Sequence, residues 1–367
     1  MDILVCPECL SRLKLEADDV KKSGESSLAV SGARCKEICA YSEFFKKGKP
    51  FESCGECLLH TIKKGRLKCG NCSAVYPIDD FIPVMLQKKL ADKTQATRRS
   101  FGYIWGHSSG KNKDLNASSL HEPHFHKIAT ALSELPGKGL WLEAGCGNGA
   151  DINEMLQAVR GLEIVGMDIS DGGVRESYKK HGNNISVHIV QGDIAKLPFK
   201  NDIFDFAYSY GVLHHLEKPG AGIKRINEVL KKGAKACIYL YEDFSDRTFF
   251  ERFSLSSVNV LRNITTRIHP KIMHALCYMA APFVYLFLAL PARALAVFDK
   301  TRPLAMRIPY HHVKGFFDGT ADLYDRFSPP FEFRFSRDSS IRFLSEHGFR
   351  DVGIANRRGW IVWGTKG

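Results

Sequence analysis

The residues with the clearest chemical potential lie at the ends of three apolar segments in the middle of the chain. Glu143 ends the first segment and begins the run Glu-Ala-Gly-Cys-Gly-Asn-Gly. Glycines at this spacing allow the backbone to approach a ligand where a side chain would block it. The second segment ends at Asp168, where an acid of a doubly wound sheet accepts ribose hydroxyl groups. The third segment is followed by Asp193 and Ile194, which suit the amine and the ring of an adenine.

Five short apolar segments alternate with helical patterns around these residues. This alternation predicts an α/β fold with a doubly wound parallel sheet. The expected strands cover residues 140–144, 163–167, 186–190, 204–209 and 236–241. Residues 337–347 and the pair 352–356 and 360–364 predict a final helix and a β-hairpin.

This ordered set resembles the class I S-adenosylmethionine-dependent methyltransferases, in particular their small-molecule "type 11" branch, over about residues 140–241. The resemblance implies a seven-stranded Rossmann-like sheet and S-adenosylmethionine as cofactor. It assigns Glu143, Gly145, Gly147 and Gly149 to the methionine part of the cofactor. It assigns Asp168 and Ile169 to the ribose, Asp193 and Ile194 to the adenine, and Tyr210 to the sulfonium side. A nicotinamide-binding sheet is the alternative, but it does not require Asp193 or the later Leu-His-His run.

Eight of the eleven cysteines precede residue 73, in short-spaced pairs that indicate a metal rather than disulfides. Cys6 and Cys9 with Cys69 and Cys72 can close a tetrahedral structural zinc site. The region resembles the zinc-ribbon proteins related to the activator subunit of tRNA methyltransferases. Four further cysteines predict a nested second knuckle at about residues 18–66 and a second zinc ion, although other groupings stay open: Cys35, Cys39, Cys54 and Cys57.

Composition and order divide the 367 residues into five parts. We expect a ribbon at 1–86, a connector at 87–127, a cofactor-binding core at 128–241, a helical apolar cap at 242–336, and a final helix and hairpin at 337–367. Within the connector, the aromatic island that holds Tyr103 and Trp105 resembles segments that cover the cofactor in related fused methyltransferases. The net charge of +12 is compatible with RNA, an anionic membrane or an acidic substrate. The first residues lack the pattern of a secretory signal, which predicts a cytoplasmic location.

Residues 272–292 carry no charge for 21 positions, about the length of a membrane span. Two prolines, Pro282 and Pro291, favour two short helices over one long one. We therefore expect an apolar hairpin that either lies in a membrane interface, through residues 272–298, or roofs the substrate pocket. A buried helix pair is the alternative.

Methyl transfer requires alignment, and it requires a base only when the nucleophile arrives protonated. The candidate bases are His214, His215, His311 and His312, with Asp322 or Tyr324 as helpers. Three functions follow: a methyltransferase of a small, lipid-linked or saccharide-type acceptor; an RNA methyltransferase, as the ribbon and the basic charge indicate; and a non-catalytic cofactor-binding interaction protein. The first fits the apolar cap best, and the intact acids at 143, 168 and 193 argue against the third.

Overall fold

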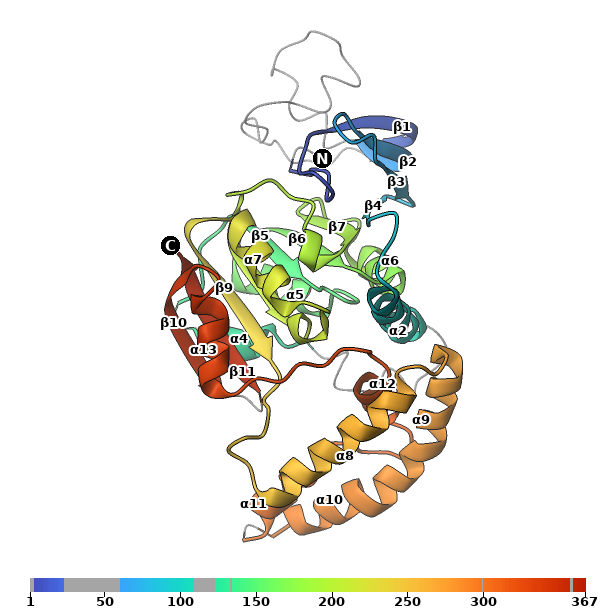
Figure 1. The fold of residues 1–367 in the computed structure, drawn as a ribbon, viewed down its shortest axis with the longest axis vertical. Helices are drawn as coiled ribbons and strands as arrows, with labels where there is room; N and C mark the ends of the chain where they lie inside the picture. Colours follow the sequence, from blue (N-terminus) through green and yellow to red (C-terminus); the bar gives the residue numbers. More distant parts are fainter. Residues whose placement is uncertain (1–2, 23–59, 109–122, 133, 299, 357–358) are drawn as a thin grey trace.

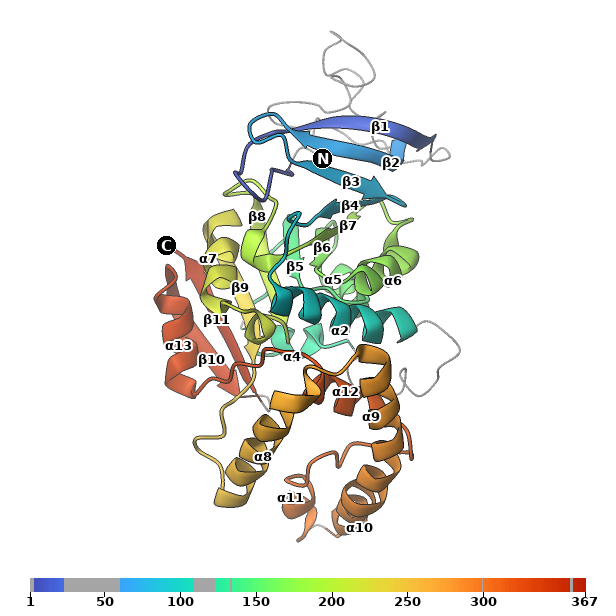
Figure 2. The ribbon, with the colours of Figure 1, turned by 45° about the vertical axis from the view of Figure 1, so that its right-hand side comes forward.

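A computed structural model describes residues 3–22, 60–108, 123–132, 134–298, 300–356 and 359–367. Figures 1 and 2 show three parts in a row along the long axis of the molecule: the N-terminal strands, the central sheet with its helices, and a helical part at the far end. The inner cysteines Cys35, Cys39, Cys54 and Cys57 fall outside the described residues.

The centre of the molecule is a sheet whose strands correspond to the predicted ones. Its order is β7-β6-β5-β8-β9-β11-β10, with β5 to β9 parallel and β11 antiparallel to β9. The bounds are β5 Leu140–Ala144, β6 Glu163–Asp168, β7 Val187–Gly192, β8 Phe204–Tyr210, β9 Leu230–Leu240, β10 Phe349–Asn356 and β11 Trp360–Lys366. The strands are short apolar runs, and both faces of the sheet are covered, as expected for parallel strands. The predicted α/β class and seven-stranded sheet are confirmed.

Helices cover the two faces of this sheet with separate apolar clusters. On one face lie α7 and α13, which contribute Ile223 and Leu344. On the other lie α4, α5 and α6, which contribute Phe125 and Met155. The bounds are α4 Phe125–Ala129, α5 Ala150–Ala158, α6 Asp171–His181, α7 Pro219–Val229 and α13 Arg337–Ser345. Among the described residues 123–132, the only helix is the short α4.

The N-terminal strands extend the central sheet instead of forming a detached ribbon. Strand β1 (Leu13–Lys22) pairs antiparallel with β2 (His60–Cys69). Strands β3 (Val75–Asp79) and β4 (Ile82–Met85) follow. β4 then pairs in parallel with β7, with Val84 opposite Gln191, and closes that edge of the core sheet. The sequence did not predict this junction, because the apolar run at 82–85 reads equally well as part of the ribbon.

The predicted connector holds a helix, α2 (Asp92–Ser108), that packs against α6. Its few apolar residues pack against neighbouring elements: Ile104 is buried, and Phe101 and Trp105 are partly buried. Glycines make the contact close, because a Cβ on Gly172 would lie 2.3 Å from the Gly102 carbonyl oxygen. The sequence predicted a connector with an aromatic segment over the cofactor but did not predict this helix, since tertiary packing overrides a weak local pattern.

The far end of the molecule is formed by the insert between β9 and α13. Its helices are α8 Phe249–Thr265, α9 Pro270–Val284, the π-helical segment η6 Tyr285–Ala289, α10 Leu290–Ala296, α11 Arg302–Ala305 and α12 Thr320–Phe327. A capping box between Thr248 and Glu251 starts α8. Together, α9, η6 and α10 are one continuous helix over Pro270–Ala296.

The predicted apolar hairpin at 272–292 is therefore wrong. The chain passes Pro282 without turning, and the wider π-turn brings the Leu290 N–H to the Tyr285 carbonyl just before Pro291, which has no N–H to donate. By length and composition this helix is long and apolar enough to cross a membrane, with a mean hydropathy of 1.8. Only 22% of its most apolar window is buried.

Candidate functional site

The glycine turn between β5 and α5 is held open by backbone geometry. Gly145, Gly147 and Gly149 all have positive φ, at 93°, 47° and 71°. A Cβ on Gly145 would lie 2.3 Å from Val212, and one on Gly147 would lie 3.0 Å from the Trp105 ring. Other residues at these positions would be strained and would close the space above the turn.

Asp168 lies at the end of β6 directly against this turn. Its carboxylate accepts hydrogen bonds from the Gly147 N–H at 3.0 Å and from the Ser170 N–H at 2.8 Å and hydroxyl at 2.7 Å. Burial raises the pKa of Asp168, and these donors oppose that rise. The contacts fix the carboxylate at the carboxyl edge of the sheet, where doubly wound folds bind ligands.

Glu143 lies behind the turn and is only 3% exposed. Its Oε2 atom has no hydrogen-bond partner among the described residues. Burial raises the pKa of Glu143 well above its ordinary value, and Asp151 and Asp168 add to the rise. A buried acceptor without a donor requires a partner, and the amino group of a bound amino acid is the kind of group that would satisfy it.

Most of the remaining residues predicted to bind the cofactor lie around the same space, but Glu143 and Gly149 are not among the residues that line it. Asp193 follows β7 and accepts a hydrogen bond from the Ala195 N–H at 2.9 Å. Tyr210 at the end of β8 stacks on Tyr239, with ring centroids 4.2 Å apart. These residues line one cavity together with Ile169, Ile194, Gly145, Gly147 and Asp168.

Helix α2 covers the cavity through Trp105 and Phe101, and Tyr103 lies elsewhere. Trp105 and Phe101 are lining residues. The Tyr103 ring lies 5.6 Å from that of Tyr324 and 5.5 Å from that of His274, inside the insert. Tyr103 was predicted to touch the cofactor, but its side chain joins α2 to the insert. Successive helix positions point about 100° apart, so Tyr103 points away from the side of α2 that carries Phe101 and Trp105.

The cavity has a volume of about 1650 Å³ and continues from the glycine turn into the insert. A drug-sized ligand fills about 300–1,000 Å³, so this space is large enough for a cofactor and a second molecule. The insert end is lined by charged and aromatic side chains as well as apolar ones: Glu242, Arg247, Arg307, Tyr310, His311, His312, Asp322, Asp325 and Arg326.

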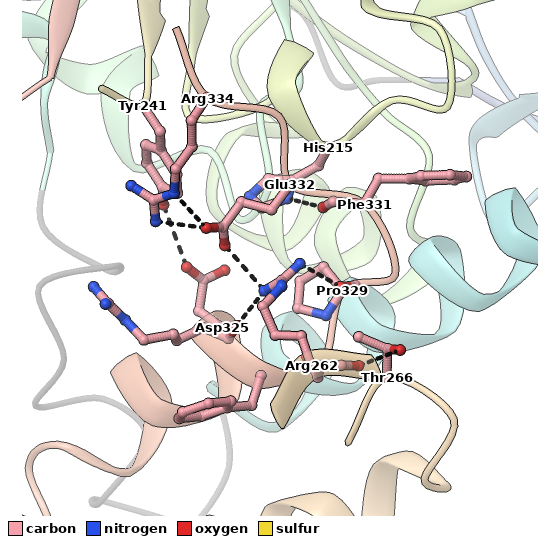
Figure 3. A network of polar contacts seen from close by, with 12 residues as sticks. His215, Tyr241, Arg262, Thr266, Asp325, Pro329, Phe331, Glu332 and Arg334 are labelled. Carbon is pink, nitrogen blue, oxygen red and sulfur yellow. Dashed lines mark hydrogen bonds and ion pairs between the residues drawn. The ribbon is translucent and has the colours of Figure 1, made fainter. Parts of the chain in front are cut away.

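A buried ionic network joins α8 to the segment before α13 at this second end (Figure 3). Arg262 of α8 donates to Glu332 at 3.0 Å and to the Pro329 carbonyl at 2.8 Å. Arg334 donates to the other Glu332 oxygen at 2.9 Å and to the Glu242 carbonyl at 3.0 Å. Burial alone would raise the pKa of Glu332, but Arg334 and Arg262 hold it below its ordinary value. Glu332 is therefore an ionised carboxylate between two cations.

His215 lies between the two ends of the cavity and carries a defined proton. Its Nδ1 is 2.7 Å from the Phe331 carbonyl oxygen, and since a carbonyl only accepts, Nδ1 must donate. Burial lowers the pKa of His215 to about 4, so the ring is neutral near pH 7 and Nε2 keeps its lone pair. His215 is a lining residue of the cavity.

His214 differs from its neighbour. It is fully buried, and neither ring nitrogen has a hydrogen-bond partner among the described residues. Its ring lies on Tyr241 with centroids 3.8 Å apart, and burial lowers its pKa well below the ordinary value. It does not belong to the lining residues of the cavity in the described structure. The geometry therefore gives no support to the predicted catalytic role of His214.

His311 and His312 both line the insert end of the cavity. His312 Nε2 lies 2.7 Å from an oxygen of Asp322, and His311 Nδ1 lies 3.0 Å from the Ile308 carbonyl oxygen. The structure therefore brings His311, which belongs to the insert, to the same cavity as His215.

Asp325 is the acid of the insert end that the sequence reasoning missed. It lines the cavity, and the Tyr241 hydroxyl lies 3.4 Å from its Oδ2. Burial raises the pKa of Asp325 to about 7, with Glu332 and Asp322 adding to the rise. In the sequence, Asp325 reads equally well as an exposed acid on an amphipathic helix. The sequence reasoning therefore missed Asp325 and its neighbour Glu332.

The N-terminal cysteines Cys6, Cys9, Cys69 and Cys72 come together in space. All four Sγ atoms lie within 4.8 Å of one another, with Cys6 and Cys72 at 3.6 Å and Cys9 and Cys69 at 3.5 Å. Four thiolates with this spacing match a closed tetrahedral zinc site. The predicted outer grouping is the one that the geometry supports.

Comparisons with known proteins agree with this geometry. Residues 142–238 match the methyltransferase domain family, and residues 1–80 match the Trm112p-like protein family. The chain carries a class I S-adenosylmethionine-dependent methyltransferase domain fused to a Trm112p-like domain. The predicted resemblances of both regions are thus confirmed.

The individual relatives share only part of their length with this chain. A tRNA (carboxymethyluridine(34)-5-O)-methyltransferase of Saccharomyces cerevisiae is 32% identical over 130 residues, 32% of this chain and 44% of that protein. A malonyl-[acyl-carrier protein] O-methyltransferase of Legionella pneumophila is 30% identical over 132 residues, 32% and 46% of the two chains. The chain spans less than half the length of these two relatives.

Among solved structures, the complex between the Haloferax volcanii Trm112 methyltransferase activator and a putative methyltransferase is similar in fold. Its TM-score is 0.42 at 12% sequence identity, over 71% of this chain and 96% of that chain.

Proposed function

We propose that this protein transfers a methyl group from S-adenosylmethionine to a small acceptor that binds in the insert half of the cavity. The observation that carries the proposal is the continuity of one cavity of about 1650 Å³ from the glycine turn to the polar wall of the insert. Such a space suits two ligands end to end, with the acceptor enclosed.

The cofactor end fits its proposed ligand in three respects. The open turn at Gly145 and Gly147 leaves room for the methionine part, and the unpaired oxygen of Glu143 can accept from its amino group. Asp168 can accept from the ribose hydroxyls, and Asp193 with Ile194 can bind the adenine. When bound, the cofactor supplies a methyl group on a positively charged sulfur.

Methyl transfer breaks the sulfur–methyl bond and leaves that electron pair on sulfur, while the acceptor atom donates a pair to form the new bond. An acceptor that arrives protonated must lose its proton to a base. The neutral His215, with its Nδ1–H held by the Phe331 carbonyl, presents Nε2 for this role. We assign His311 to the insert end, where it can contact the acceptor.

The class of acceptor follows from the composition of the insert end. Asp325, His312 and Arg326 can bind hydroxyl or anionic groups, and apolar Leu255, Leu288, Leu304 and Met306 line the same cavity. This mixture favours a polar, saccharide-type or other hydroxylated head joined to an apolar chain, which is a lipid-linked acceptor.

RNA is the alternative acceptor, because the S. cerevisiae relative is a tRNA methyltransferase and a Trm112p-like domain is present. The cavity wall argues for the small molecule, since nucleic-acid sites carry clustered cations and stacking aromatics on an open surface. Here the cavity is enclosed by the insert, and the acids Glu242, Asp322 and Asp325 line its insert end beside the cations.

Label transfer separates the two acceptors. The full chain is incubated with methyl-labelled S-adenosylmethionine and a cell extract, which is then divided into RNA, lipid and aqueous fractions. We expect label in the lipid fraction and none after substitution of His215. Nuclease-sensitive label would favour RNA, and absence of label from every fraction would contradict methyl transfer itself.

We also propose one structural zinc ion at Cys6, Cys9, Cys69 and Cys72. Four thiolates leave no open coordination position, so the ion would hold the ribbon strands together instead of taking part in methyl transfer. Metal analysis of the purified chain tests this: a Cys69→Ser variant is expected to contain one zinc ion fewer than the unmodified chain, and equal zinc contents would contradict it.

A further inference from the structure

We infer that the insert docks on the surface of an anionic membrane through an apolar face on α9, η6 and α10. This face, called here the insert face, is defined by Ile272, Leu276, Met279, Phe283, Leu286, Phe287 and Leu290. The inference goes beyond methyl transfer, because docking requires neither cofactor nor acceptor.

The insert face is a continuous stripe along one side of the helix. Its members recur at helical spacing, and their exposed fractions run from 41% for Leu276 to 71% for Phe287. The opposite side packs into the protein through Met273, Cys277 and Ala281, which join Ile104 of α2 and Leu323 of α12 in one cluster. A helix that is held on one side by protein cannot be surrounded by lipid, so an interfacial position fits better than a span.

A second exposed apolar stripe runs along α8. Phe249, Phe253, Val260 and Ile264 are 61–74% exposed. They lie on the side of α8 opposite to Leu255, which lines the cavity, and Arg262, which binds Glu332. Monomeric soluble proteins rarely expose apolar surface of this extent, and such surface marks an interaction site.

The charges of the insert select the partner. Residues 252–317 contain nine lysines and arginines and one acid, Asp299. Eight of the nine cations are exposed, and two of them, Arg307 and Lys314, also line the cavity: Arg252, Arg267, Lys271, Arg293, Lys300, Arg302, Arg307 and Lys314. An apolar face with exposed cations and almost no acids complements anionic lipid headgroups with acyl chains below them.

The cavity reaches the surface in the same region. Leu304 and Met306 line the cavity and are also 57% and 45% exposed. They lie in or directly after α11, which packs against α10 at the end of the molecule remote from the N-terminal strands (Figures 1 and 2). Docking would therefore bring the apolar side of the cavity mouth to the bilayer.

Vesicle co-sedimentation of the full chain, without cofactor or acceptor, tests the inference. The probes are vesicles of phosphatidylcholine alone and of phosphatidylcholine mixed with phosphatidylglycerol in equal parts. We expect binding to the anionic vesicles that weakens with salt. Phe287→Asp is expected to weaken binding about tenfold or more, and Arg302→Glu about fivefold or more.

Two matched variants serve as controls. Val75→Asp introduces the same charge at an exposed apolar position of β3, and Lys232→Glu reverses an exposed cation of β9. Both are expected to bind vesicles like the unmodified chain, and all four variants are expected to unfold at an unchanged temperature because the positions are exposed.

Three outcomes would overturn the inference: no sedimentation with anionic vesicles, equal sedimentation with both vesicle types, or a dimer in light scattering that Phe287→Asp dissociates. The last result would make the insert face a contact between two copies. Since label transfer is measured separately, failure of docking and failure of methyl transfer are distinguishable.

Discussion

The two ends of the cavity are built in different ways. The cofactor end consists of strand termini and bare backbone. Gly145, Gly147 and Asp168 lie within 24 consecutive residues, and the Gly147 N–H donates to the Asp168 carboxylate. The insert end depends on side-chain ion pairs between α8 and the segment before α13, which are about 70 residues apart. The first end is specified locally, and the second exists only after the chain has folded around it.

The largest expected effect tests the point where both ends meet. His215→Phe removes the proposed base and is expected to lower the turnover number by about 10²–10⁴-fold. His214→Phe changes the adjacent, fully buried ring in the same way, and is expected to leave turnover within a few-fold because this ring does not line the cavity. Steady-state assays that separate kcat from KM compare the two. Equal losses would mean that packing, and not proton transfer, explains the effect.

The next prediction concerns the insert end alone. Glu332→Gln removes the charge between Arg262 and Arg334, whose side chains are 8% and 13% exposed. A buried cation without its partner is expected to lower the free energy of unfolding by about 3–5 kcal/mol. Denaturant titration measures it, with Glu346→Gln as an exposed control. A loss below about 1 kcal/mol, the usual value of a surface pair, would show that the network is not what holds the insert.

A third prediction concerns the cofactor end alone. Asp168→Ala removes the acceptor of the proposed ribose hydrogen bonds and is expected to weaken S-adenosylmethionine binding by about 10²-fold. Calorimetric titration tests this, and Asp338→Ala, whose side chain is 82% exposed on α13, is the control. An unchanged affinity in Asp168→Ala would remove the ribose assignment while leaving the insert end untouched.

The smallest expected effect is a pH dependence of stability. The pKa of Asp325 is raised to about 7 from an ordinary value of 3.8, so the folded chain holds this proton more tightly than the unfolded chain. The stability that this bound proton contributes is fully present below pH 3.8 and is lost as the pH rises from there to about 7. Asp325→Asn is therefore expected to melt at a higher temperature than the unmodified chain at pH values above this range, with the difference vanishing in acid. A constant difference at every pH would contradict the burial of this carboxyl.

The same contrast explains what could be predicted from the sequence. The order of strands and the acids at 143, 168 and 193 follow from short-range patterns of apolar residues and glycines, and the structure brings Asp168 and Asp193 to one cavity. His214 and His215 have the same residue type and adjacent positions, so the pattern cannot tell which ring faces the cavity. Asp325 and Glu332 acquire their surroundings from α8, whose register relative to them no local pattern encodes.

Tertiary packing also explains the errors in the elements. Helix α2 has a weak amphipathic pattern, and its contacts with α6 stabilise it. The prolines at 282 and 291 predicted a break, yet a π-turn accommodates the second and the helix continues. The grouping of Cys6 and Cys9 with Cys69 and Cys72 was predictable, because two closely spaced cysteine pairs suit one tetrahedral site.

The pairing of β4 with β7 has a mechanical consequence. Val84 and Met85 of β4 pair with Gln191 and Gly192 of β7, and Asp193 follows directly after β7. The ribbon strands thus support the start of the loop that is proposed to bind the adenine. Removal of the proposed zinc ion from the four thiolates is therefore expected to weaken the proposed binding of the adenine, although none of the described residues up to 86 lines the cavity.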